Sequence, residues 1–207
     1  MRVMLISDRT LRSLEEIWPF LPGAAEAGLT DLMIREKDLP GGPLFTMVRE
    51  AVYRCTPIGI QVIVNDRIDV ALAAGAGAVH LGVTAVPVSE AKRIAGSRLR
   101  IGASTHSLEE HRAAESAGAD YATFGPVFAT PSKAAYGPPV GVDALRAACA
   151  SGKPPVLALG GITPERARRL RGTGIAGVAA ISAILCAVDP ARAVSELVAA
   201  LGEGRSV

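Results

Sequence analysis

Short apolar runs alternate with amphipathic stretches along the whole chain. Continuous apolar runs bounded by polar residues or glycine are typical of strands buried on both faces of a parallel sheet. Strands are predicted at residues 3–7, 32–35, 61–64, 78–81, 100–103, 121–124, 156–159 and 177–180. The stretches between them repeat apolar residues at helical spacing. Helices are therefore predicted at residues 44–55, 68–74, 88–95, 108–116, 142–150, 164–171 and 191–201.

The stretch 14–28 also has a helical pattern, but Pro19 and Pro22 interrupt it. Proline in a helix interior removes a hydrogen bond and clashes with the preceding turn. We therefore expect the regular helix to begin near Pro19 or later and to stop at Gly28.

Eight strand-then-helix units in 207 residues predict a closed barrel. Short buried strands that alternate with helices pair in parallel through helical crossovers. The main rival is an open doubly wound sheet, which would normally carry a glycine-rich fingerprint after its first strand. Residues 7–10 read Ser-Asp-Arg-Thr and are not such a fingerprint. The expected fold is α/β, a single (β/α)8 TIM barrel that forms one domain over residues 1–207.

Composition agrees with helices packed closely on a sheet. The chain is 49% hydrophobic and 4% aromatic, and it contains 22 glycines. Its 22 basic and 20 acidic residues give a net charge of +2, which argues against a large nucleic-acid interface. One basic cluster has helical spacing, and we interpret it as a solvated helix face. It consists of Arg166, Arg168, Arg169 and Arg171.

The three cysteines, Cys55, Cys149 and Cys186, are far apart and odd in number, which fits buried thiols in a reducing compartment. The apolar run at the N-terminus is too short for a signal peptide, and the longest apolar stretch, 175–188, is too short to cross a bilayer. We expect a soluble cytoplasmic protein with no membrane or nucleic-acid partner. The sequence does not indicate an oligomeric state.

Polar residues follow most of the predicted strands. Core packing alone would not place charged residues at only one end of each strand. Strands of a barrel all end at one rim, which is where barrel enzymes place their active sites. These residues are Asp8, Arg35, Lys37, Asn65, Asp66, Ser104, His106, Thr130, Ser132, Lys133 and Ser182, together with the pair Gly160-Gly161.

Two of these loops suit phosphate groups. Thr130, Ser132 and Lys133 place two hydroxyl donors and an ammonium within four residues, although an ordinary surface turn could have the same sequence. Gly160-Gly161 would let backbone amides approach an anion closely, and Ser182 could donate a further bond.

Six ordered blocks resemble the thiamin phosphate synthases and their TenI-like relatives, over nearly the whole chain. The blocks are REKD at 35–38, NDRIDVALAAGAGAVHLG at 65–82, GASTHS at 102–107, YATFGPVFATPSK at 121–133, ALGGI at 158–162 and GVAAISAI at 177–184. The resemblance implies condensation of hydroxymethylpyrimidine pyrophosphate with a thiazole phosphate and release of pyrophosphate. Such a reaction needs mainly charge and positioning from the protein.

The resemblance also implies roles for individual residues. Arg35, Lys37, Ser104 and Lys133 would be catalytic. The substrates would be held by Asn65, His106, Thr130, Ser132, Gly160, Gly161, Ile181 and Ser182. Asp66 would bind Mg²⁺. Taken without the resemblance, residues 35–38 could instead be a surface ion-pair run, and Asn65-Asp66 a helix N-cap.

Three positions depart from the family pattern: Met33 and Val83 replace glutamines, and Ala85 replaces the aspartate that is the second Mg²⁺ ligand in the synthases. A weakened metal site is therefore expected. Mg²⁺ binding would not be abolished, because one or two carboxylates, waters and substrate phosphates often hold this ion.

Two alternatives remain open at this stage. A TenI-like thiazole tautomerase would use the same pocket but needs an acid–base group, and Pro126 occupies the position of the histidine that those relatives use. His106 is the nearest substitute, unless it is a hydrogen-bonded structural residue, and His80 is interpreted as a packing residue at the barrel end. The second alternative is a non-catalytic barrel that binds the thiazole phosphate.

Overall fold

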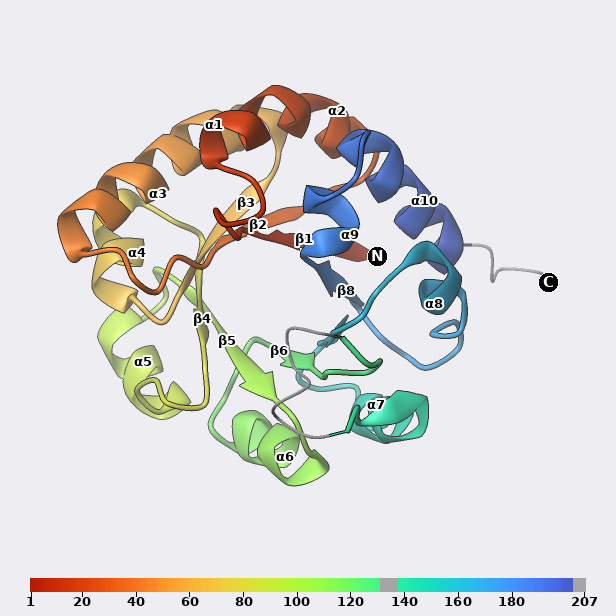
Figure 1. Ribbon diagram of the computed structural model, residues 1–207. Coiled ribbons are helices and arrows are strands. Elements are labelled where there is room, and N and C mark those ends of the chain that lie inside the picture. Colours follow the sequence, from red (N-terminus) through yellow and green to blue (C-terminus); the bar gives the residue numbers. More distant parts are fainter. Residues whose placement is uncertain (131–137, 203–207) are drawn as a thin grey trace.

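Eight parallel strands close into a barrel in sequence order, as predicted (Figure 1). The computed structural model describes residues 1–130 and 138–202. β1 pairs with both β2 and β8, which closes the ring. The strands are β1 (Arg2–Ile6), β2 (Asp31–Ile34), β3 (Gln61–Asn65), β4 (Ala78–Leu81), β5 (Arg100–Thr105), β6 (Tyr121–Phe124), β7 (Val156–Leu159) and β8 (Gly177–Ala180).

The helices surround the barrel (Figure 1). They are α1 (Leu14–Ile17), α2 (Leu21–Glu26), α3 (Gly41–Cys55), α4 (Ile68–Ala74), α5 (Val88–Ala95), α6 (Leu108–Ser116), α7 (Gly141–Cys149), α8 (Pro164–Arg168), α9 (Ser182–Leu185) and α10 (Pro190–Gly202), with short 3₁₀ helices η1 (Trp18–Phe20) and η2 (Thr56–Ile58). Among the described residues, no helix has both the length and the apolar character needed to span a bilayer.

The predicted start of the first helix is wrong. α1 begins at Leu14, because Ser13 caps it: the Ser13 side chain accepts the Glu16 N–H, and the Glu16 carboxylate accepts the Ser13 N–H. The prolines do not prevent this, since Pro19 lies in the first turn of η1 and Pro22 in that of α2. First-turn N–H groups have no partner within the helix, so proline costs little there.

Two further differences are small. The sequence pattern did not predict the one-turn helix α9, and the other predicted elements match within three residues at each end. Cys55 and Cys149 are buried as expected, but Cys186 is exposed.

The core has two layers, one between the strands and the helices and one inside the barrel. Side chains alternate along each strand, so every second residue points inward. The apolar inner layer consists of Met4, Ile6, Met33, Ile63, Ala78, Tyr121, Leu157 and Ala179.

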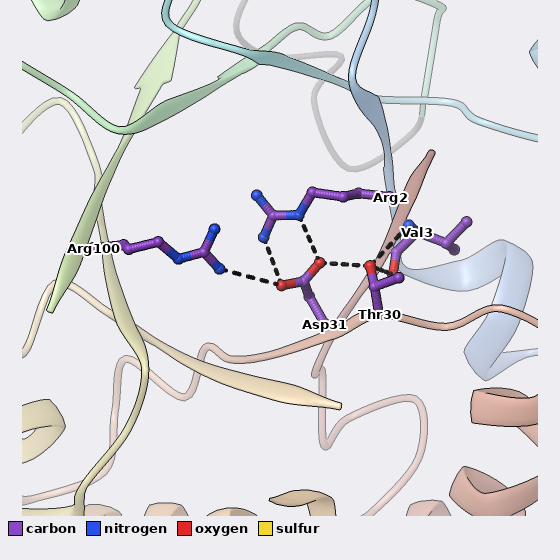
Figure 2. A network of polar contacts seen from close by, with 5 residues as sticks. All are labelled: Arg2, Val3, Thr30, Asp31 and Arg100. Atoms are coloured by element: carbon purple, nitrogen blue, oxygen red, sulfur yellow. Dashed lines mark hydrogen bonds and ion pairs between the residues drawn. The ribbon is translucent and has the colours of Figure 1, made fainter. Parts of the chain in front are cut away.

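A buried ionic cluster lies below this layer, at the amino-terminal ends of the strands (Figure 2). Asp31 is 1% exposed and accepts two hydrogen bonds from Arg2, Nε to Oδ2 at 3.0 Å and Nη2 to Oδ1 at 2.5 Å. The Thr30 hydroxyl donates to Oδ2 at 2.6 Å, and Arg100 Nη2 lies 3.9 Å from Oδ1. One carboxylate thereby connects β1, β2 and β5.

Tyr121 fills the space beside this cluster. The Arg2 guanidinium lies 5.1 Å from the centre of its ring, and burial raises the pKa of the phenol. A Cβ at Gly102 would lie 2.2 Å from the ring, so the neighbouring strand needs glycine there. Tyr121 and the ionic cluster therefore close the barrel at this end.

Asp31→Asn should lower the free energy of unfolding by about 1.5–3 kcal/mol, because it removes the charge from the buried acceptor of the Arg2 hydrogen bonds, while the two guanidinium groups remain partly hydrated. Urea unfolding followed by circular dichroism measures the loss. Asp143→Asn is the matched control, since its ion pair with Arg146 is at the surface and should contribute nothing measurable. Equal effects of the two substitutions would contradict a special role for the buried cluster.

Candidate active site

The carboxyl-terminal ends of the strands form a polar rim. Met33, Ile63, Ala78 and Tyr121 point into the barrel, and the residue two positions after each of them is polar. Because side chains alternate, these residues also point inward, one level higher. They are Arg35, Asn65, His80 and Thr123. Ser104 joins them from β5, where it is the register partner of Thr123.

His80 is the buried centre of this rim, at 3% exposure. Its Nε2 lies 2.9 Å from the Ser104 hydroxyl and 3.3 Å from the Thr123 hydroxyl. Burial lowers the pKa of His80 to about 4; the negative charge of Asp66 opposes this shift, and the positive charge of Arg35 adds to it. The ring is therefore neutral near pH 7. The His80 ring orients the Ser104 hydroxyl through this hydrogen bond. His80 therefore does more than the packing role that the sequence analysis assigned to it.

The interpretation of residues 35–38 as a surface ion-pair run holds in part: Lys37 pairs with Asp66 and Asp38 with Arg9, whereas Glu36 is a buried anchor. Glu36 is buried, accepts a 2.6 Å hydrogen bond from the Ser7 hydroxyl, and pairs with Arg9 at 3.3 Å. The Arg35 N–H donates to the same hydroxyl at 3.0 Å. Glu36 thus fixes the loop, and its neighbours Arg35 and Lys37 are exposed at the rim. Within the described part of the chain, no ion pair involves Arg35.

Asp66 is not a helix N-cap, because α4 is capped by Arg67 without a side-chain bond. It adopts a left-handed backbone conformation with φ +62°, which is uncommon outside glycine. Its Oδ1 accepts the Gly82 N–H at 2.7 Å, and its Oδ2 accepts Asn65 Nδ2 at 2.7 Å. Lys37 Nζ lies 3.5 Å from Oδ2. The carboxylate therefore connects three loops.

A pocket of about 200 Å³ opens beside this carboxylate. Lys37, Asn65 and Asp66 contribute to its lining, together with the apolar side chains of Leu39 and Leu44. The pocket brings an ammonium, an amide and a carboxylate together, which suits a polar anionic group accompanied by a cation.

The loop after β6 runs beside the loop after β7 and continues the sheet past the strand ends. The Val127 N–H donates to the Leu159 carbonyl at 2.8 Å, and the Phe128 N–H donates to the Gly160 carbonyl at 3.1 Å. Gly160 has φ +97°, and a Cβ there would lie 2.5 Å from Pro126. Only glycine permits this close approach of the two loops.

Thr130 follows this ladder and is half-buried at the rim. Ser132 and Lys133, the other two members of the predicted phosphate loop, lie outside the described residues. Across the β7–β8 pair, Gly161 follows β7, while Ile181 is the N-cap of α9 and Ser182 its first residue. The predicted thiazole phosphate residues are thus on adjacent loops of the same rim.

His106 follows β5, and its ring is held by Glu110 from α6, the helix that comes next in the chain. Its Nδ1 lies 3.0 Å from the Glu110 carboxylate, which also accepts the His106 N–H at 2.6 Å. This geometry favours the structural interpretation of His106 over an acid–base role.

Sequence reasoning missed Thr123 and Ser7, which contact site residues directly. Thr123 lies inside an apolar run, and only strict period-two counting from Tyr121 would have marked it as inward-facing. Ser7 is the last residue of the predicted first strand and was given no role, because its bond to Glu36 depends on a contact between distant segments.

The arginine cluster is not only a solvated face, so that prediction is wrong for two of its members. Arg166 Nη1 donates to the carbonyls of Gly161 and Ala129, and Arg171 Nε donates to the Ala200 carbonyl at 2.6 Å. Arg168 is exposed as predicted. Arginine supplies five donors in a rigid plane, which allows one side chain to bridge several carbonyls.

The closed barrel and its polar rim define a TIM-barrel protein whose candidate active face is the carboxyl-terminal end of the strands. The family described as thiamine monophosphate synthase (TMP-TENI) matches residues 3–184, and the chain belongs to this family.

Individual relatives agree. A Chlorobium luteolum protein named thiamine-phosphate synthase is 40% identical over 186 residues, which cover 90% of this chain and 88% of that protein. A protein of the same name from Anaeromyxobacter dehalogenans is 40% identical over 183 residues, covering 88% and 82%. The solved thiamine phosphate pyrophosphorylase from Pyrococcus furiosus is 35% identical and superposes with a TM-score of 0.87 over 99% of this chain and 97% of that one.

The pKa of His80 predicts how stability depends on pH. Its folded-state pKa of about 4 is below the ordinary value of 6.5, so the unfolded chain binds a proton that the folded chain rejects. Its stabilising contribution is complete above pH 6.5 and is lost as the pH falls towards 4, in total about 3 kcal/mol.

His80→Gln should remove that part of the pH dependence of the free energy of unfolding, measured by urea titration between pH 4 and 7. His106→Gln is the control, because it removes a partly exposed histidine from the same rim. It should keep the loss of stability between pH 6.5 and 4 that is attributed to His80. The same loss in His80→Gln would disprove the assignment.

Proposed function

We propose that this protein is a thiamin phosphate synthase, which joins hydroxymethylpyrimidine pyrophosphate to thiazole phosphate and releases pyrophosphate. Membership of the family and the relatives named thiamine-phosphate synthase support this activity. The observation that carries the proposal is the placement of two separate groups of candidate anion-binding residues on one rim. Arg35 and Lys37 lie on one side, and Gly160-Gly161 with Ser182 on the other.

The chemistry suits these residues. The bond between the pyrimidine methylene carbon and the pyrophosphate oxygen breaks, and its electron pair leaves with pyrophosphate. The thiazole nitrogen then donates its lone pair to the cationic carbon. Arg35 and Lys37 would stabilise the growing negative charge, and Ser104, oriented by His80, would donate a hydrogen bond. Lys133 has the same proposed role, but this proposal rests on the sequence alone because Lys133 lies outside the described residues.

The donor set fits a Mg²⁺ ion that arrives with the pyrophosphate. Among the described residues, no group of three or more His, Cys, Asp or Glu side chains could hold a metal by itself. Asp66 would supply one carboxylate, and Ala85 leaves the second position apolar. Substrate phosphates and waters commonly complete such a site. Bound there, Mg²⁺ would neutralise charge on the leaving group.

No observation favours the tautomerase. Pro126 replaces the histidine of those relatives, and His106 is held by Glu110. His80 is buried, with a pKa of about 4, so it is a poor proton donor near pH 7. A barrel that only bound thiazole phosphate would have no use for the second basic site at Arg35 and Lys37.

Incubation with both substrates and Mg²⁺ should yield thiamin phosphate and pyrophosphate, detected by chromatography and a coupled pyrophosphate assay. Arg35→Met should lower kcat/KM by about a hundredfold, because it removes a charged donor from the position where negative charge grows on the leaving group. Arg93→Met is the control, since Arg93 is on an exposed helix face and, within the described residues, its hydrogen bond and ion pair are both with Glu90 on its own helix.

Two results would replace the proposal with an alternative. Proton exchange on the thiazole ring without condensation would identify a tautomerase. Tight binding of thiazole phosphate with neither reaction would identify a non-catalytic binder.

Ala85→Asp should lower the Mg²⁺ concentration needed for half-maximal activity several-fold, because it restores a second carboxylate near Asp66. A Mg²⁺ titration of the initial rate measures this change. Val86→Asp adds the same charge one residue further along an exposed part of the loop, and should leave the Mg²⁺ dependence unchanged. An identical response of both variants would mean that added charge, and not a ligand position, is responsible.

A further inference from the structure

The side chain of Arg9 crosses from the loop after β1 to the loop after β2. Its Nε lies 3.3 Å from Glu36 Oε2, and its Nη2 donates a hydrogen bond to the Asp38 carboxylate. Lys37 lies between these two acidic residues in the chain and lines the candidate pocket. One guanidinium therefore contacts the residues on both sides of this lysine.

Lys37 is at the tip of a turn. The Leu39 N–H donates to the Glu36 carbonyl at 3.3 Å, which makes Lys37 and Asp38 the two central residues of a β-turn. The Arg9 guanidinium holds the side chains of the first and third residues of this turn. The backbone at the second residue, Lys37, is therefore fixed from both sides.

The loop that carries Arg9 is itself ordered. The Asp8 carboxylate accepts the Thr10 N–H at 3.1 Å and the Thr10 hydroxyl at 2.6 Å. The Asp8 carbonyl accepts the Leu11 N–H at 3.0 Å. These bonds close a turn around Arg9. Because β1 and β2 are paired strands, the two turns follow neighbouring strands at the same rim.

The contact with Glu36 is the one that anchors Arg9. The Asp38 side chain is 71% exposed, so its ion pair with Arg9 would contribute little alone. The Glu36 side chain is 5% exposed, and a buried carboxylate needs both a counter-charge and hydrogen bonds. Arg9 supplies the charge, and the Ser7 hydroxyl donates to Oε1 at 2.6 Å. Arg9 is thus fixed at its buried end and reaches Asp38 from there.

We propose that Arg9 is a positioning residue, which holds Lys37 where its ammonium can contact both Asp66 and the incoming pyrophosphate. Lys37 Nζ lies 3.5 Å from Asp66 Oδ2. Lysine places its charge on a flexible four-carbon stem, so a fixed backbone narrows the region that the ammonium can reach. This inference rests on the proposed function, because it takes pyrophosphate as the anion that Lys37 binds.

A double-mutant cycle tests whether Arg9 acts through Lys37. Arg9→Met should weaken the binding of inorganic pyrophosphate with Mg²⁺, measured by calorimetric titration, about tenfold, within the range of coupling between residues of one network. In the Lys37→Met background the same substitution should change the affinity less than about twofold, because no ammonium is left to position. Arg9→Lys keeps the charge but cannot bridge two carboxylates with a planar fork, so it should still weaken binding about threefold.

Arg54→Met is the matched control. Arg54 is also partly exposed and paired with a carboxylate, that of Glu50, at 2.6 Å. It is in the last turn of α3, which runs back from the rim, so this pair lies towards the opposite end of the barrel. Its loss should leave pyrophosphate binding unchanged. Hydrogen exchange at the Leu39 amide should become faster in Arg9→Met and not in Arg54→Met, which reports on the turn without any ligand.

The proposal is overturned if Arg9→Met weakens pyrophosphate binding equally with and without Lys37, or if Arg9→Lys binds as tightly as the unaltered protein. Either result would mean that Arg9 acts through its own charge. Should Arg9→Met fail to fold, Arg9→Lys takes its place in the cycle, and its loss of affinity should likewise disappear in the Lys37→Met background.

Failure of the proposed function has a different signature. The unaltered protein would then bind pyrophosphate and show the coupling between Arg9 and Lys37, but it would form no thiamin phosphate from the two substrates. An unaltered protein that binds no pyrophosphate would overturn both proposals.

Discussion

The closed ring depends on the charge balance around Asp31. A carboxylate inside a barrel is tolerated only when neighbouring groups neutralise it and satisfy its oxygens, and Arg2, Arg100 and Thr30 do both (Figure 2). These residues come from three strands or their approaches, so the ion cluster also fixes strand positions relative to one another. With this end closed by ions and by Tyr121, the opposite rim is the open end of the barrel.

Strand register then determines the chemistry of the rim. Along β2 the inward positions are Asp31, Met33 and Arg35, so one strand passes from the ionic base through the apolar layer to the cationic rim. A shift of one residue in pairing would turn Arg35 towards the helices and bring Ile34 inward. The site is thus a direct result of pairing that the core enforces.

The sequence predicts the periodic part of this molecule well. The eight strands, the barrel and the rim position of residues such as Arg35 and Ser182 follow from short-range patterns and parallel pairing. Contacts between loops do not follow, because they depend on distances between segments remote in sequence. The His80–Ser104 bond and the bridge made by Arg166 are of this kind. The start of α1 was missed for a local reason, the capping box at Ser13; the two prolines lie after α1, in the first turns of η1 and α2.

The Lys37–Asp66 pair determines what ligand binding would require at the proposed Mg²⁺ site beside Asp66. In the structure the ammonium and the carboxylate are each other's counter-ion, 3.5 Å apart. An incoming magnesium pyrophosphate is itself a pair of opposite charges. Its arrival would amount to ion exchange, with the anion taking the ammonium and the metal taking the carboxylate. Charged groups would change partners and never stand alone, and the negative charge of the pyrophosphate that Mg²⁺ leaves uncompensated would face Arg35 on the same rim.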